Sequence, residues 1–253
     1  MPKQSLKKVT DYCNSFLKIQ EINDWPGAVN GLQVTNSGQI SKIGAAVDVS
    51  PQVINKAIEF NVDFLIVHHG LFWNSNLPLV GQRYQMLKNI FSNNIAIYSA
   101  HLPLDNHPTI GNNVLLAKKL GLKHQKPLVF DHGQWLGILA ETKLPRQSLY
   151  YALNKLFNNS VRLIPFGPET CTKIGIITGA AGDLIKQVAQ SGVDTFITGE
   201  GHHWSYTFAS EIMLNVFYCG HYLSETFGVK ALADHLSKRF KLPWVFIDCP
   251  TGL

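Results

Sequence analysis

The sequence lacks several features that identify whole classes of protein. Its 253 residues include only four cysteines, and no pair of them has the Cys-x-x-Cys spacing of a zinc ribbon or a redox motif. No apolar run approaches the roughly 20 residues that cross a membrane, and none follows the first lysines as it would in a secretory signal. We therefore expect a cytoplasmic protein without a membrane span, whose thiols are reduced and mostly buried.

Charged residues are also sparse, at 15% of the chain. The 22 lysines and arginines exceed the 17 aspartates and glutamates by only five, and no block of five or six basic residues occurs. This pattern argues against a nucleic-acid partner and suits a small anionic ligand such as a nucleotide. The hydrophobic content of 45% is enough for a sizeable core, which excludes general disorder.

Two long segments of the chain repeat each other. Ile43–Gly70 aligns without a gap on Ile174–Gly201, and Asp63 and Asp194 are among the identical pairs. Each copy consists of an apolar run, a turn, a segment with helical periodicity and a second apolar run, which predicts a β-α-β unit. In the first copy, Ser50-Pro51 predicts the start of a helix, with serine as the cap and proline at the first helical position.

A second, shorter element is duplicated as well. The strand-like segment Ile97–His101 leads to Asp105, and the strand-like segment Val216–His221 leads to Glu225, so that both copies contain His-x-x-x-carboxylate. Two repeated elements in the same order predict an internal duplication. We therefore expect an α/β protein of two related lobes, a first at residues 1–126 and a second at 127–253, which interlock.

Histidines follow several of the predicted strands. His68 and His69 come directly after the apolar run 64–67, at a strand end where ligands gather in open α/β sheets. Taken alone, such a pair is equally typical of a polar strand exit, and either His-x-x-x-carboxylate alone is more typical of a surface pair or a helix cap. Three such clusters at three strand ends instead predict a metal site. Imidazole nitrogen mixed with carboxylate oxygen suits Zn, Mn, Fe, Co or Ni, whereas Ca and Mg prefer oxygen alone.

The chain resembles one known family, the GTP cyclohydrolase 1 type 2 homologs, or NGG-interacting-factor-three-like proteins, in their short bacterial form. The similarity extends over essentially the whole chain. It rests on NGLQV (30–34), LIVHHGLFW (65–73), YSAHLPLDNHPTIGNN (98–113), TGEGHHW (198–204) and GHYLSE (220–225).

The resemblance implies two divalent transition-metal ions per chain in a cleft between the lobes, with the metal (Zn, Mn, Fe, Co or Ni) unspecified. The ligands it implies are His68, His69 and Asp105 from the first lobe and His221 and Glu225 from the second. A bridging Glu225 would bring the set to about six bonds, whereas two ions of coordination number four or five take about eight to ten. Some positions therefore stay open for water or substrate, and a site of this kind is reactive rather than structural.

The resemblance further implies a homohexameric ring, or toroid, and a metal-dependent hydrolase acting on GTP or a related purine nucleotide. The alternative is a metal-delivery or regulatory binding protein that uses the same ligands without turnover. His101 matches a family histidine that is not consistently a metal ligand, and we expect it to transfer a proton. The roles of Glu200, His202 and His203 stay open between substrate contact and plain loop. The Gly179–Gly182 turn is a weak phosphate-binding pattern.

Overall fold

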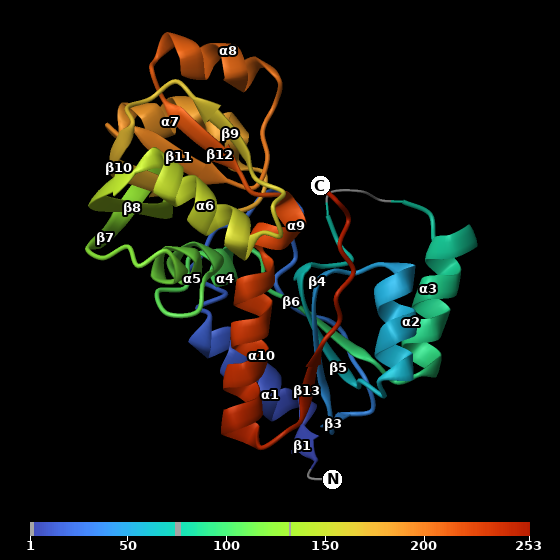
Figure 1. The fold of residues 1–253 in the computed structure, drawn as a ribbon. Helices are drawn as coiled ribbons and strands as arrows, with labels where there is room; N and C mark the ends of the chain where they lie inside the picture. Colours follow the sequence, from blue (N-terminus) through green and yellow to red (C-terminus); the bar gives the residue numbers. More distant parts are fainter. Residues whose placement is uncertain (1–2, 74–76, 132) are drawn as a thin grey trace. The chain divides into compact units, whose positions relative to one another are not determined.

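The computed structural model describes residues 3–73, 77–131 and 133–253 (Figure 1). The chain forms two compact units. Unit 1 contains the residues up to Leu104 together with Gly228–Cys249, and unit 2 contains Asp105–Phe227 together with the last four residues. The division into lobes 1–126 and 127–253 comes from the sequence repeat and stays a prediction. The two compact units divide the chain differently, because the C-terminal segment Gly228–Cys249 belongs to unit 1. Among the described helices, none combines the length and apolarity required to cross a membrane.

Unit 1 is built around a five-stranded sheet with the strand order β13-β4-β5-β6-β2. The first four strands are parallel, and β2 is antiparallel to β6. Figure 1 shows α2 and α3 on one side of this sheet and α1 and α10 on the other. The bounds are α1 Leu6–Phe16, β2 Gly31–Val34, β4 Ile43–Asp48, α2 Pro51–Glu59, β5 Phe64–His69, α3 Gly81–Ser92, β6 Ala96–Ser99, α10 Thr226–Phe240 and β13 Trp244–Phe246, with a separate small pair β1 Gln4–Ser5 and β3 Gln39–Ile40.

The first predicted β-α-β unit is β4-α2-β5. Its helix begins where the sequence predicts, because the Ser50 hydroxyl accepts a hydrogen bond from the Val53 amide at 3.2 Å and Pro51 occupies the first turn. The apolar positions Val53, Ile54 and Ala57 are buried against the sheet. Strands β4 and β5 are covered on both faces, which explains their nearly continuous apolar sequences.

Unit 2 contains a six-stranded sheet with the order β7-β8-β10-β11-β12-β9, in which β10, β11 and β12 are parallel. In Figure 1, α5 and α6 lie on one side of this sheet and α7 and α8 on the other. The bounds are α5 Asn112–Lys119, β7 Gln125–Asp131, β8 Gln134–Pro145, α6 Arg146–Leu156, β9 Arg162–Pro165, β10 Thr170–Ile176, the 3-10 turn η1 Ala181–Leu184, α7 Ile185–Gln190, β11 Thr195–Thr198, α8 Trp204–Glu211, β12 Asn215–Tyr218 and α9 His221–Ser224. The short helix α4, Leu102–Asp105, begins in unit 1 and ends with the first residue of unit 2.

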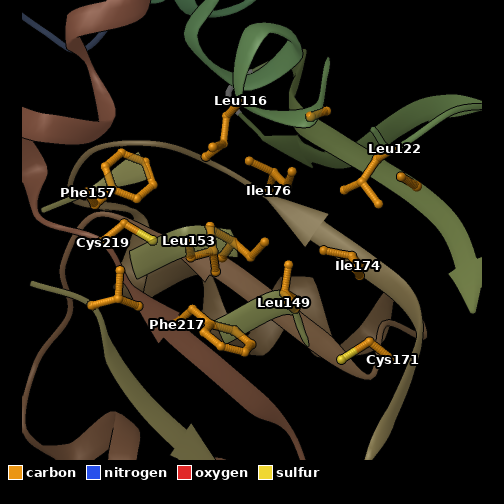
Figure 2. Packing of buried hydrophobic residues seen from close by; sticks show 14 residues of the cluster. Leu116, Leu122, Leu149, Leu153, Phe157, Cys171, Ile174, Ile176, Phe217 and Cys219 are labelled. Carbon is orange, nitrogen blue, oxygen red and sulfur yellow. The ribbon is translucent and has the colours of Figure 1, made fainter. Parts of the chain in front are cut away.

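The core of unit 2 supports the strands that lead to its histidine. Figure 2 shows Leu149 and Leu153 of α6 packed over Ile174 of β10 and Phe217 of β12, all of them fully buried. Close packing of this kind keeps the ends of the strands in place. Three of the four thiols, those of Cys13, Cys171 and Cys219, are buried, which confirms the expectation of mostly buried cysteines.

The repeated aspartates Asp63 and Asp194 make equivalent hydrogen bonds in the two sheets. The carboxylate of Asp63 accepts hydrogen bonds from the backbone amides of Ser41 and Lys42 at 2.8–3.0 Å, just before β4. The carboxylate of Asp194 accepts from the amides of Thr172 and Lys173 at 2.8 and 3.0 Å, within β10. Each aspartate thus fastens the first strand of a β-α-β unit to the residue that begins the second. The duplication itself stays a prediction, but these bonds give its identical aspartates a physical role.

Candidate metal centre

Three histidines gather at the ends of neighbouring strands in unit 1. His68 and His69 end β5, and His101 follows β6, its parallel neighbour. The distance between ring centroids is 4.8 Å for His68 and His69 and 4.9 Å for His68 and His101. One nitrogen from each ring lies within 4.8 Å of the other two. Parallel pairing therefore brings together the two histidine clusters that the sequence places at strand ends.

Each of these imidazoles is held at Nδ1 by an oxygen. The Nδ1 of buried His68 lies 2.8 Å from the carbonyl oxygen of Ala100, and that of His69 lies 2.7 Å from Oδ1 of Asp48. Asp48 and His69 are paired in the register of β4 and β5, so the sheet itself aligns them. Asp48 thus supports His69 from the neighbouring strand.

His101 is held by an aspartate that sequence reasoning missed. Its Nδ1 lies 2.7 Å from Oδ1 of Asp24, whose side chain is only 6% exposed. Asp24 also accepts bonds from the Asn30 amide and from the backbone amides of Leu102 and Trp25. Burial raises the pKa of Asp24, but the bond and charge of His101 and the amide donors outweigh it and lower the pKa below its ordinary value. Asp24 is therefore a carboxylate that fixes the orientation of His101.

Trp73 borders the same cluster. Its ring meets the ring of His101 edge-on, with centroids 5.0 Å apart, and its Nε1 donates a hydrogen bond to the Gly70 carbonyl at 3.0 Å. An indole in this position shields one side of His101 from water and keeps the loop after β5 close to the histidines.

Unit 2 holds a second set of donors. His221 opens α9, directly after β12, and Glu225 follows that helix. The Nδ1 of His221 lies 2.8 Å from Glu200 and its Nε2 lies 3.2 Å from Glu225, whose side chain is 3% exposed. Burial lowers the pKa of His221, but the bonds and charges of Glu225 and Glu200 together raise it to about 9. Two carboxylates around one imidazole favour a cation at this position, either a proton or a metal ion.

Asp105 lies in unit 2 with Glu225 and is buried. The ligand oxygens of the two carboxylates are within 4.8 Å of each other. Oδ1 of Asp105 accepts a hydrogen bond from the side-chain amide of Asn112 at 2.7 Å. Two buried carboxylates this close repel each other, and a divalent cation relieves that repulsion.

Two glycines let the backbone approach these donors. Gly179 has a positive φ of 72°, and a Cβ at this position would collide with Oε1 of Glu225. A Cβ on Gly199 would lie 2.6 Å from the Gly179 carbonyl oxygen and 2.9 Å from the Cα of His221. The phosphate-binding interpretation of the Gly179 turn is wrong for this position, because the Glu225 carboxylate lies against it and would repel an anion.

The donor set passes a chemical test for a transition metal. An imidazole whose Nδ1 donates to a carbonyl or carboxylate carries its lone pair on Nε2, the nitrogen that then ligates a metal. His68, His69 and His101 are held in this way; His221 is held at Nδ1 by Glu200 as well, but its Nε2 faces Glu225 and must lose a proton before it can ligate a metal. Unit 2 adds the oxygens of Asp105 and Glu225 to the nitrogen of His221, which is the mix of nitrogen and oxygen donors that suits Zn, Mn, Fe, Co or Ni. The residues therefore fit the predicted metals, and Asp24, Asn30 and Asn112 are the supporting residues that the sequence did not reveal.

A cavity of about 880 Å³ lies within unit 2, beside Glu200. His202 and His203, whose roles the sequence left open, both line this cavity. Nε2 of His202 also lies 3.3 Å from Asp183 at the surface. Both histidines thus belong to the wall of a cavity rather than to the metal donors described above.

The chain is similar to known proteins over nearly its whole length. A family model described as Duf34/NIF3 (NGG1p interacting factor 3) matches residues 4–251. A Pyrococcus horikoshii protein named "GTP cyclohydrolase 1 type 2 homolog" is 37% identical over 249 residues, which cover 97% of this chain and 98% of that protein. A Haemophilus influenzae protein of the same name is 38% identical over 240 residues, covering 93% and 94%. The crystal structure of the Thermus thermophilus protein TTHA1606 has a TM-score of 0.90 at 40% identity, covering 99% of this chain and 100% of that chain.

Proposed function

This chain belongs to the Duf34/NIF3 family, and we propose that it is a dinuclear metal-binding protein that hydrolyses GTP or a related purine nucleotide. One observation carries the proposal: four imidazoles are each held at Nδ1 by an oxygen acceptor, three in unit 1 and one in unit 2. That arrangement fixes each ring with Nε2 directed away from the Nδ1 bond; in His68, His69 and His221 this nitrogen is the proposed ligand atom, and in His101 it is the proposed site of proton transfer. The name that the relatives carry supplies the substrate class.

In this proposal, two divalent ions of Zn, Mn, Fe, Co or Ni would be bound by donors from both lobes of the sequence repeat. Unit 1 supplies histidine nitrogens, whereas unit 2 supplies two carboxylates and one histidine, and the carboxylates neutralise most of the added charge. Glu225 would hold both ions, because a carboxylate has two oxygens that can each accept a cation. The ligands are His68, His69, Asp105, His221 and Glu225.

Bound divalent ions supply Lewis acidity, which makes water a nucleophile near neutral pH. Side chains of the protein itself supply the proton transfer and keep the imidazoles in position. His101 gives or takes a proton at Nε2. Asp24, 77 residues earlier in the chain, orients its ring, and Trp73 covers one side of it. His69 keeps its orientation through Asp48, and His221 through Glu200. These carboxylates keep the imidazoles from rotating as charge develops.

The test begins with metal content. Protein purified without chelator is expected to carry close to two transition-metal ions per chain by elemental analysis, and Glu225→Ala is expected to lose more than half of them. Glu211→Ala, an exposed glutamate of α8, is the matched control and keeps the metal. Absence of metal from the parent protein would refute the site, and full metal in Glu225→Ala would refute the bridge.

Turnover separates the enzyme from its rival. The metal-loaded protein is expected to convert GTP, with a rate that rises over about pH 6–8 as coordinated water deprotonates. If GTP and a panel of other nucleotides stay intact with every one of the five metals, and an acceptor chelator strips the ions readily, the protein is a metal-delivery or regulatory binding protein instead.

A further inference from the structure

We propose that the cavity within unit 2 binds the nucleotide itself, with the phosphates at Arg162 and the base against tyrosines. The inference rests on the proposed function and deepens it, because it assigns the substrate to a site made by unit 2 alone. The cavity of about 880 Å³ lies within the size range of small-molecule sites, which runs from about 300 to 1,000 Å³.

The cavity wall offers one cationic side chain that can bind an anion. Arg162, the first residue of β9, lines the cavity together with His202 and His203, and an arginine fork matches the oxygens of a phosphate. Glu200 is the one acidic side chain among the described residues that line it, and its carboxylate is 2.8 Å from Nδ1 of His221. Asp183 lies near His202 but outside the lining, so Arg162 is the principal cation.

The rest of the wall suits a flat, partly apolar group. Tyr206, Tyr218 and Tyr222 line the cavity; Tyr222 is buried, whereas Tyr206 is exposed and offers a ring on which an aromatic base can stack. Tyr218 is fixed in place by a hydrogen bond between its hydroxyl and the hydroxyl of Ser205 at 2.5 Å. The backbone at Gly201 packs against the same ring, where any larger residue would collide with it. This part of the wall is therefore preformed.

Position connects the cavity to the metal chemistry. Glu200 lines the cavity and also orients His221, so an occupant of the cavity lies next to the residue that holds a proposed ligand. A nucleotide anchored by its phosphates at Arg162 would extend its base past the tyrosines toward Glu200. The proposed pose places the phosphates of the nucleotide at Arg162, its base at the tyrosines and its reacting end near Glu200.

The experiment measures binding without catalysis. Metal-stripped protein is titrated with GTP and, separately, with guanosine, by isothermal titration calorimetry. Arg162→Ala is expected to weaken GTP binding at least about tenfold and to leave guanosine binding unchanged, because only GTP carries the phosphates. Tyr206→Ala is expected to weaken both. Arg83→Ala, in α3 of unit 1 and outside the cavity lining, is the matched control and changes neither.

Two results would overturn the inference: parent protein that binds neither probe, or Arg162→Ala that binds GTP as tightly as the parent. Failure of the proposed function gives a different result, namely absent metal or absent turnover in the loaded protein. The metal content of Arg162→Ala, measured by elemental analysis, is expected to equal that of the parent, since Arg162 is not a ligand. A loss of metal in this variant would refute the separation of the two sites.

Discussion

Replacing Gly179 with alanine tests whether backbone approach to Glu225 holds the unit 2 donors in place. Gly179 is fastened on both sides: its amide donates to the Ser224 hydroxyl at 3.0 Å, and its carbonyl accepts from the Gly199 amide at 2.9 Å. The backbone therefore has no room to retreat from an added Cβ. Glu225 must move instead, and its Oε1 is the atom that the Cβ would strike.

The expected loss of folding free energy in Gly179→Ala has two parts. Alanine at a positive φ costs about 1 kcal/mol whatever surrounds it. Displacing Glu225 also breaks its pairing with His221, which costs about 3 kcal/mol, at the low end for a buried pair because the His221 side chain is 27% exposed. Gly192 has nearly the same φ, +75° against +72°, but nothing lies within 4 Å of its would-be Cβ. Gly192→Ala therefore isolates the first part.

Thermal and urea unfolding in EDTA give both numbers. At about 2–4 °C per kcal/mol for a chain of this size, Gly192→Ala is expected to lower the melting temperature by about 3 °C and Gly179→Ala by about 12 °C. Gly179→Ala is also expected to lose metal when purified without chelator, whereas Gly192→Ala keeps it. Equal stability and equal metal content in the two variants would refute the reasoning.

Other predictions address the remaining supporting residues and the assembly. Asp24→Asn removes the charge that orients His101, so we expect turnover to fall about tenfold or more while metal content, by elemental analysis, stays constant; unchanged turnover would contradict this role. The fold lowers the pKa of Asp24, so its contribution to stability is complete above the unfolded value of about 3.9 and is lost as the pH falls through the lower folded value. Urea unfolding from pH 5 to pH 2 should therefore show a smaller loss in Asp24→Asn than in the parent. Asp63→Ala removes the acceptor for two strand amides and should lower the free energy of unfolding by about 2–4 kcal/mol in urea titrations, and a change below about 0.5 kcal/mol would argue against it. Light scattering is expected to give about six times the 28.2 kDa of one chain, as in a hexameric ring, and a mass near that of one chain would exclude this assembly.

Local patterns in the sequence were enough for much of the fold. The cap at Ser50 lies where the sequence predicts a helix start. The predicted segment 97–101 corresponds to β6, whose bounds are Ala96–Ser99. These features depend on hydrogen bonds and side-chain periodicity within a few residues, so the chain itself specifies them.

Strand pairing was harder to predict because it joins distant segments. β13, near the end of the chain, pairs with β4, about 200 residues earlier, and so returns the C-terminal segment to unit 1. The antiparallel edge strands β2 and β9 have short sequences that do not indicate which strand each of them pairs with. The burial of whole faces determines these pairings, and no local pattern encodes it.

The candidate site divides in the same way. The sequence by itself determined which residues are candidates for binding a metal, because histidines and carboxylates after apolar strands are visible in the chain and resemble a family pattern. Only the tertiary structure decided which groups hold them, as with Asp24 on His101 and Asn112 on Asp105. A buried imidazole or carboxylate must find a hydrogen-bond partner, and close packing selects that partner from whatever loop the fold brings near. Supporting residues that are selected by packing have no fixed spacing in the sequence, so no motif reveals them. The candidate ligands follow the ends of predicted strands, so the sequence does reveal them.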